Sequence, residues 1–277
     1  MRQSDFEFIR TLVYERSRIK LGNRKRELVA VRLARRLRAT RIASVDDYCE
    51  LLRSPRQEEE RSRLIDAMST NHTCFFREGS HFEFVRYRIV PEMLERRGKE
   101  GWKRLVAWSA ACSSGEEPYS LAMALADSMD PANWPWRVEA TDVSTRMLEV
   151  AQNAVYAGDS VIGKAPEWAL PYFQRGSGAQ KDSYRIKPAL RARVKFRHLN
   201  LLEGPPPFQE AMHVIFCRNV MIYFDRATQE ELVDKLARQL VPGGYLVVGH
   251  SERLLNVAHE LQPVAPAIYR RPLATGV

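Results

Sequence analysis

From about residue 104 onward, short apolar runs alternate with stretches of helical periodicity, and this alternation constrains the fold more than any other feature. The apolar runs cover residues 104–109, 137–141, 194–199, 213–217 and 244–249. The helical stretches cover residues 116–129, 144–153 and 226–240. Such alternation predicts a mostly parallel sheet with helices on both faces. A last β run near 266–270 follows after a short connection, which predicts an antiparallel edge strand.

Residues 155–193 interrupt this alternation. The segment contains Gly158, Gly163, Gly176 and Gly178, and its FQRGSGAQKDSYRIK stretch predicts two short strands around a glycine-rich turn. We therefore expect a small β subdomain over about 155–193, inserted in an α/β domain that covers residues 76–277.

The N-terminal quarter shows helical patterns only, and we expect a small all-α domain over residues 1–75. The expected helix starts are a capping box of Ser4 with Glu7, an amphipathic stretch over 23–40, Ser44 with Asp47, and Pro55. This region is also basic, because residues 1–70 hold 17 Lys and Arg against 11 Asp and Glu. The whole chain carries a net charge of +9, so nucleic acid, acidic protein and anionic lipid all remain possible partners.

Composition excludes several classes of protein. The opening MRQSDFEF is too charged for the apolar core of a signal peptide, and no apolar run approaches the roughly 18 residues that cross a bilayer. The four cysteines are scattered and form no C-x-x-C pair, which disfavours a zinc site or a disulfide scaffold. We expect a cytoplasmic protein without a metal.

Polar residues follow three of the expected strands at the edge where open α/β sheets bind ligands. Strand 104–109 leads into the small residues AACSSG and a helix, although a plain strand-to-helix turn is an alternative because no G-x-G-x-x-G is present. Asp142 ends the second strand, where a carboxylate can accept both hydroxyls of a ribose, and Asn200 could pair with an adenine edge. Each residue alone is also typical of a turn. Together they predict an adenosine nucleoside across the sheet.

The stretch VIFCRNVMIYFD, residues 214–225, places Arg218, Asn219 and Tyr223 at the next strand end. With the segments MSTNHTCFFRE, WSAACSSGEEPYS, ATDVS, LNLL and PGGYLVVGHSE, the chain resembles the CheR family of chemoreceptor glutamate methyltransferases over nearly its whole length. Cys74 and Cys112 depart mildly from the family pattern. The resemblance implies the class I methyltransferase fold, a Rossmann-like doubly wound α/β sheet with an antiparallel last strand.

The resemblance also implies the reaction and its site. The cofactor would be S-adenosyl-L-methionine (AdoMet), the product S-adenosyl-L-homocysteine (AdoHcy), and the acceptors glutamate side chains of chemoreceptors. The residues implied to line the cofactor site are Asn71, Thr73, Arg77, Glu117, Asp142, Asn200, Leu201, Arg218 and Asn219. Arg77 and Tyr223 would lie nearest the transferred methyl, although Tyr223 could instead be a half-buried aromatic of the fold.

Partners follow from the same resemblance. On the helix expected over 23–40, we expect Arg32, Arg35 and Arg36 to face outward and to dock acidic receptor helices, with a merely solvated basic face as the alternative. The β subdomain could bind a receptor C-terminal tail. We expect a monomer that neither binds nucleic acid nor inserts into a membrane.

Three other functions fit the same features less well. An NAD-dependent oxidoreductase lacks support because the glycine fingerprint is missing. A nucleic-acid methyltransferase is suggested only by the basic charge. A non-catalytic AdoMet sensor would not need Arg77 and Tyr223, which are both present.

Overall fold

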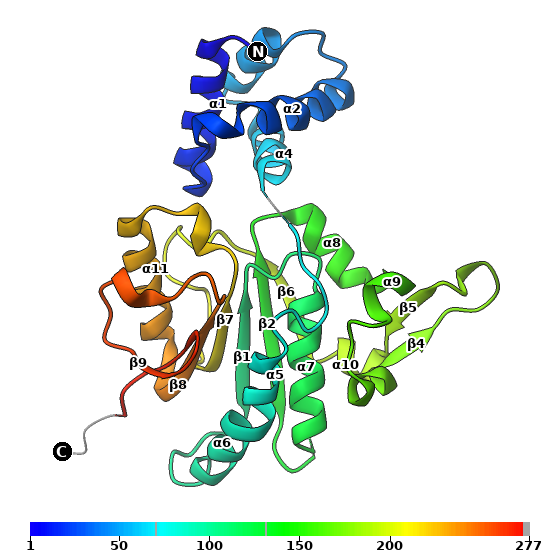
Figure 1. Ribbon diagram of the computed structural model, residues 1–277, viewed down its shortest axis with the longest axis vertical. Helices are drawn as coiled ribbons and strands as arrows, with labels where there is room; N and C mark the ends of the chain where they lie inside the picture. The colour runs from blue at the N-terminus through cyan, green and yellow to red at the C-terminus, as the bar shows by residue number, and fades with distance from the viewer. Residues whose placement is uncertain (70, 131, 274–277) are drawn as a thin grey trace. The chain divides into compact units, whose positions relative to one another are not determined.

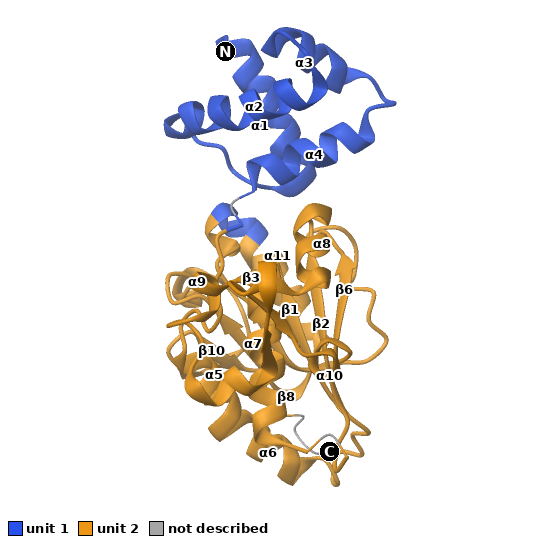
Figure 2. Cartoon of the chain, turned by 90° about the vertical axis from the view of Figure 1, so that its right-hand side faces the viewer, with its two compact units in different colours: residues 1–71, 223–228 blue, residues 72–222, 229–277 orange. Residues whose placement is uncertain are grey.

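The computed structural model describes residues 1–69, 71–130 and 132–273 (Figure 1). The chain forms two compact units, which Figure 2 colours separately. One unit contains Met1–Asn71 together with Tyr223–Thr228, and the other contains His72–Ile222 and Gln229–Val277. The division lies close to the boundary expected after residue 75, but the return of Tyr223–Thr228 to the first unit was not expected.

The first unit, here called the helical unit, is built from four α-helices. They are α1 (Gln3–Ser17), α2 (Arg26–Thr40), α3 (Val45–Arg53) and α4 (Glu58–Met68). Their apolar faces meet in a core that includes Phe6, Ile9, Leu33, Tyr48 and Leu64. The amphipathic pattern therefore forms a small independent core, as the sequence predicts.

Two of the expected helix starts are wrong and one is confirmed. A cap at Ser4 would start helix α1 at Asp5, but the helix begins two residues earlier, at Gln3. There the Asp5 carboxylate accepts a hydrogen bond from the Arg2 N–H at 2.9 Å. Helix α4 begins at Glu58 and not near Pro55. The Ser44 side chain does cap α3, because its Oγ accepts from the Asp47 N–H at 3.1 Å.

The second unit, here called the α/β unit, contains a seven-stranded sheet in the order β6-β2-β1-β7-β8-β10-β9. The strands are β1 (Leu105–Ala110), β2 (Trp136–Asp142), β6 (Val194–His198), β7 (Met212–Cys217), β8 (Leu240–Val248), β9 (Gln262–Ala265) and β10 (Ile268–Arg270). The first five in this order are parallel, and β10 is antiparallel to β8. Every residue of β1 and β7 is buried, as expected for strands covered on both faces.

The antiparallel strand near 266–270 is confirmed, but it is not the edge. Strand β9 pairs antiparallel outside β10 and is the true edge. This short strand contains Pro263, which removes one ladder donor and hides the strand from a pattern search.

Helices α7 (Glu116–Ser128), α8 (Thr145–Asn153) and α11 (Arg226–Gln239) match the expected helical stretches. An additional helical run precedes β1. It consists of α5 (Ser80–Phe84), a π-helical turn over Val85–Ile89 and α6 (Val90–Arg96), and it packs against α7 (Figure 1). The helical run was not among the elements expected from the sequence.

The insertion forms a three-stranded sheet, β3-β5-β4, and not the two strands expected. Its strands are β3 (Val155–Ala157), β4 (Phe173–Arg175) and β5 (Ser183–Ile186), and all neighbours are antiparallel. The short helices α9 (Gly158–Val161) and α10 (Pro188–Arg191) flank them. Strand β3 was missed because three residues show no readable alternation.

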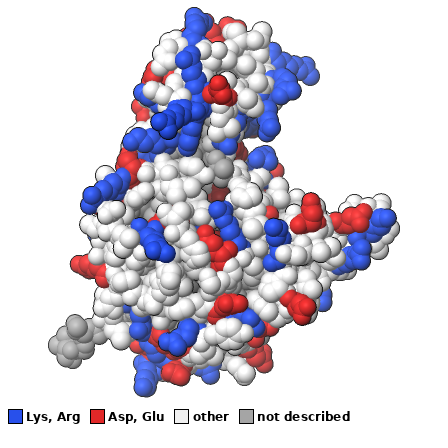
Figure 3. Space-filling view, viewed as in Figure 1, with Lys and Arg blue, Asp and Glu red and all other residues white. Residues whose placement is uncertain are grey.

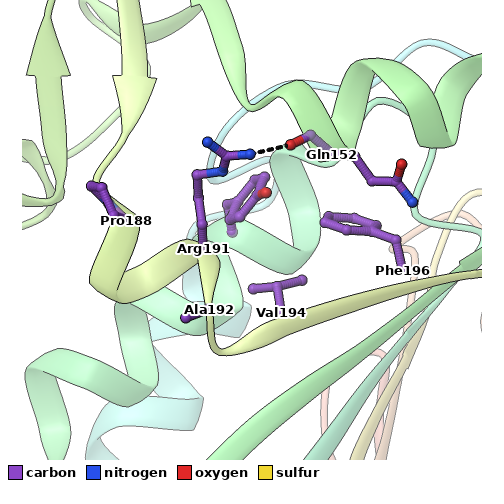
Figure 4. A pocket seen from close by; sticks show the side chains of 7 residues that line it. Gln152, Pro188, Arg191, Ala192, Val194 and Phe196 are labelled. Carbon is purple, nitrogen blue, oxygen red and sulfur yellow. Dashed lines mark hydrogen bonds between the residues drawn. The ribbon is translucent and has the colours of Figure 1, made fainter.

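A cavity of about 460 Å³ lies where α10 meets the start of β6 (Figure 4). Tyr119, Val194 and Phe196 supply its apolar wall, and Arg191 donates to the Gln152 carbonyl at 2.7 Å. Its wall includes the first residue of β6, whereas ligands of such sheets bind at the carboxyl ends of the strands. None of its lining residues is among the expected site residues.

Candidate functional site

Most of the expected site residues of the α/β unit lie at or follow the carboxyl ends of β1, β2, β6 and β7, namely Glu117, Asp142, Asn200, Leu201, Arg218 and Asn219. Strand β1 lies between β2 and β7, so the chain winds outward from β1 in one direction and returns to build the other half of the sheet. Ligands of open α/β sheets bind at this switch in strand order. The position is thus fixed by topology before any side chain is considered.

The backbone at these strand ends is unusual. Ala111 and Ser113 follow β1 with φ of 64° and 48°, and Asn219 follows β7 with φ of 60°. Residues other than glycine rarely adopt this left-handed region, and such residues concentrate at binding and active sites. Gly115 has φ of 96°, and a Cβ there would lie 2.8 Å from the Ala151 Cβ, so glycine is required where the loop meets α8.

Asp142 ends β2 and organises the loop that follows β1. One carboxylate oxygen accepts from the Ser113 N–H at 2.7 Å, and the other accepts from the Ser144 N–H at 2.9 Å. The residue is only 6% exposed. The carboxylate therefore holds the backbone on both sides of the strand end, and acceptance of ribose hydroxyls by Asp142 stays a prediction.

Arg218 is the centre of a buried ion-pair cluster. Its guanidinium donates to Glu117 at 3.1 Å, to Glu78 at 3.0 Å and to the Arg77 carbonyl, and the residue is 4% exposed. The other Glu117 oxygen accepts from the Ser109 hydroxyl at 2.7 Å. These contacts join the segment before α5 to α7 and the end of β7. The primary effect of Arg218 and Glu117 is to hold the walls of the site, and direct contact of either with a cofactor remains a prediction.

Burial and charge act on these carboxylates in opposite directions. Burial raises the pKa of Glu117, and the nearby Arg218 guanidinium only partly offsets that effect. Burial would also raise the pKa of Glu78, but Arg218 together with His81 and His250 outweighs burial, and the pKa is lowered. Glu78 thus holds the negative charge that Arg218 requires.

Asn200 forms a turn with its own neighbours. Its side-chain oxygen accepts from the Leu202 N–H at 3.2 Å, and its amide donates to Glu203 at 2.9 Å. The neighbouring Leu201 is buried, and its carbonyl accepts from Lys235 at 2.9 Å. Pairing of Asn200 with adenine stays a prediction.

The segment around Arg77 lies beside the Arg218 cluster. The Arg77 guanidinium donates to the His72 carbonyl at 2.9 Å, while Thr73 is half-buried. Phe76 and Glu78, on either side of Arg77, have φ of 51° and 56°. The backbone is therefore left-handed on both sides of Arg77, the residue expected to lie near the transferred methyl.

Asn71 and Tyr223 belong to the helical unit. The Tyr223 ring packs against the helical core, with the Lys25 ammonium 5.4 Å from its centroid, and its carbonyl accepts from the Lys20 N–H at 3.1 Å. Asn71 is half-buried. The predicted roles of Asn71 in cofactor binding and of Tyr223 near the methyl stay predictions.

The expectation that Arg32, Arg35 and Arg36 all face outward is partly wrong, and receptor docking at this face stays a prediction. Arg36 donates to Glu60 at 3.0 and 2.7 Å and keeps only 17% of its side chain exposed, and Arg32 donates to the Met68 carbonyl. Val29, Leu33 and Leu37 form the inward stripe, and in a helix the positions of Arg32 and Arg36 flank it. Arg35 is exposed, as expected. Figure 3 shows Lys and Arg side chains gathered over the helical unit.

A cluster that the sequence did not reveal brings Glu78, His81 and His250 together, with potential metal-ligating atoms within 4.8 Å of one another. Glu78 Oε2 lies 3.5 Å from His81 Nδ1, but the same oxygen accepts from Arg218. A guanidinium on the shared oxygen opposes a divalent cation at that place. We therefore interpret this cluster as part of the packed interior and not as a metal site.

Glu252 is another residue at the strand ends that was not expected from the sequence. It is 7% exposed and binds backbone N–H groups after β7 and β8. The sequence does not reveal this role, because Asn219 and Ile222 lie 30 residues or more away along the chain.

The described helices include none with both the length and the hydropathy that a membrane span requires.

Comparison with known proteins agrees with this geometry. The CheR methyltransferase SAM-binding domain matches residues 71–269, and the CheR methyltransferase all-alpha domain matches residues 4–69. The chemotaxis protein methyltransferase of Salmonella typhimurium is 38% identical over 95% of this chain and 88% of its own length. The proteins of the same name from Escherichia coli and Borreliella burgdorferi are 37% and 35% identical, over 95% and 94% of this chain and 89% and 91% of their own lengths. The chain is a SAM-dependent methyltransferase and belongs to the CheR family.

Proposed function

We propose that this enzyme transfers a methyl group from AdoMet to glutamate side chains of chemoreceptors, forming glutamate methyl esters and AdoHcy. The observation that carries the proposal is similarity along both units to proteins named chemotaxis protein methyltransferase, the first covering 95% of this chain. A receptor glutamate is the acceptor that the sequence resemblance implies.

The residues at the strand ends fit AdoMet. Asp142 has a buried carboxylate at the end of β2, the edge of the sheet where a ribose would lie. The loop Ala110–Gly115 consists of small residues in left-handed turns, which lets a ligand approach the backbone. When bound, AdoMet supplies an electrophilic methyl on a sulfonium.

The chain's own contribution is binding, orientation and exclusion of water. A glutamate acceptor has a reference pKa of about 4.3, so it is already a carboxylate at neutral pH and needs no general base. The enzyme must hold that carboxylate in line with the methyl. We assign Arg77 to positioning the acceptor carboxylate and Tyr223 to aligning that carboxylate with the methyl. Arg77 is assigned mainly to positioning because a cation bound tightly to the carboxylate would weaken it as a nucleophile.

We assign receptor docking to exposed cations of α2, above all Arg35. Electrostatic attraction between a basic face and an acidic helix speeds their association, and salt weakens this attraction. The β subdomain is a second candidate surface, for a receptor tail.

The proposal is tested by incubating the enzyme with methyl-labelled AdoMet and either a receptor cytoplasmic fragment, DNA or RNA. We expect alkali-labile label in the receptor fragment alone. Label in nucleic acid would support the nucleic-acid methyltransferase instead, and AdoMet binding without any transfer would support the sensor.

A further inference from the structure

The Glu252 carboxylate holds both ends of the turn that follows β7. Oε2 accepts from the Asn219 N–H and from the Gly249 N–H at 3.0 Å, and Oε1 accepts from the Ile222 N–H at 3.2 Å. Two of these donors begin and end the segment Asn219–Ile222. One buried side chain therefore fixes a turn that lies 30 residues or more away in the sequence.

This turn needs support from outside. Asn219 adopts φ of 60°, a conformation that persists only where surrounding contacts determine it. The backbone N–H groups of residues 219 and 222 point to the same carboxylate, which supplies charge-assisted acceptors for both.

Gly249 provides the space for this arrangement. A Cβ at Gly249 would lie 2.7 Å from the Asn219 Nδ2 and 2.7 Å from Glu252 Oε2. A side chain there would displace the turn, the carboxylate or both. The segment GHSE at 249–252 thus provides both the space and the hydrogen-bond acceptor that hold the turn.

We propose that Glu252 is a positioning residue for methyl transfer, which sets the Asn219–Ile222 turn against the cofactor and fixes the chain directly before Tyr223. The proposal rests on the proposed function, since it takes Asn219 to line the cofactor site. Glu252 acts through this turn and is not assigned a contact with AdoMet.

The test compares AdoHcy affinity, by calorimetry below the unfolding temperature, for Glu252→Gln and a matched control. Glutamine keeps the size of the side chain but replaces one acceptor oxygen with a donor that faces a backbone N–H. We expect affinity to fall about tenfold, the loss of roughly one charge-assisted hydrogen bond. The control is Glu139→Gln on β2, which changes a carboxylate that is 1% exposed and paired with Arg137 and Arg197. It should lower the melting temperature and leave AdoHcy affinity unchanged.

Two further variants keep the outcome decisive. Gly249→Ala pushes on the same turn with the carboxylate intact, and it should weaken AdoHcy binding even if Glu252→Gln fails to fold. Asn219→Ala tests the cofactor site itself. If Asn219→Ala weakens binding while folded Glu252→Gln and Gly249→Ala bind as the wild type does, the positioning role is overturned and the cofactor assignment stands. If Asn219→Ala has no effect, the turn lies outside the cofactor site and both assignments are wrong.

Discussion

The Asp142 carboxylate accepts a hydrogen bond from the Ser113 N–H at 2.7 Å, which ties the end of β2 to the loop after β1. Ser113 adopts φ of 48° in that loop. The residue expected to bind a ribose therefore also shapes the loop beside it. If Asp142 binds the ribose, the same side chain serves both binding and preorganisation of the loop.

Replacing Asp142 by alanine should lower AdoHcy affinity about tenfold or more, because a ribose would lose its charged acceptor and the Ser113 N–H would lose its partner. Charge-assisted bonds contribute roughly 1.5–3 kcal/mol each, which corresponds to at least a tenfold change in affinity. Calorimetry on the folded variant gives the measurement. The control is Asp159→Ala, at an exposed position in α9. Unchanged affinity in a folded Asp142→Ala would exclude the ribose assignment.

Tyr223→Phe should lower kcat while leaving AdoMet affinity close to that of the wild type. The phenylalanine keeps the ring that packs on the helical core beside Lys25, and it removes only the hydroxyl. A hydroxyl needed for alignment acts mainly in the transition state, so its loss lowers kcat. Tyr87→Phe, at a tyrosine that is 65% exposed, provides the control. Equal losses in kcat and in AdoMet affinity would place Tyr223 in the cofactor pocket.

Reversing the charge of Arg35 and Arg38 to glutamate should raise KM for receptor and flatten its dependence on salt, without changing AdoMet affinity. Both side chains are exposed, whereas Arg32 and Arg36 are engaged inside the helical unit. Steady-state kinetics across ionic strengths measures the effect. The double reversal of the exposed Lys99 and Lys103 changes net charge equally and should have little effect. Identical kinetics for the two double variants would show that α2 is only a solvated face.

Stability should decrease as pH falls from about 6.5 towards about 4, in part because of His81. Burial, aided by the Arg218 cation, lowers the pKa of His81 from 6.5 to about 4. Below pH 6.5 the unfolded chain therefore binds a proton that the folded chain does not, and this favours unfolding until the folded pKa is reached. His81→Phe should reduce the decrease in the free energy of unfolding across this window, measured by denaturant titration. The control, His72→Phe at an exposed position, should leave the pH dependence unchanged. An unaltered profile in His81→Phe would mean that His81 takes up its proton normally in the fold.

The sheet could be predicted from the sequence because its buried strands leave continuous apolar runs, such as residues 213–217. The additional strands could not, because β3 has only three residues and β9 contains a proline. The helical run from Ser80 contains a π-helical turn over Val85–Ile89, which breaks the period that identifies a helix.

The candidate site shows a similar limit. Asp142 could be recognised because its role follows from its place at a strand end. The engagement of Arg36 could not, since Glu60 lies on another helix and only the packing of α2 on α4 brings them together. Glu252 was missed for the same reason, because its partners at residues 219 and 222 are distant in sequence.

The measurement that tests the central claim most directly is peptide mapping, by mass spectrometry, of a receptor cytoplasmic fragment incubated with the enzyme and AdoMet. We expect one added methyl on peptides that contain specific glutamates, lost on mild alkali treatment and absent when those glutamates are replaced by alanine. Methylation that resists alkali, or that persists after every modified glutamate is replaced, would contradict glutamate methyl-ester formation by this enzyme.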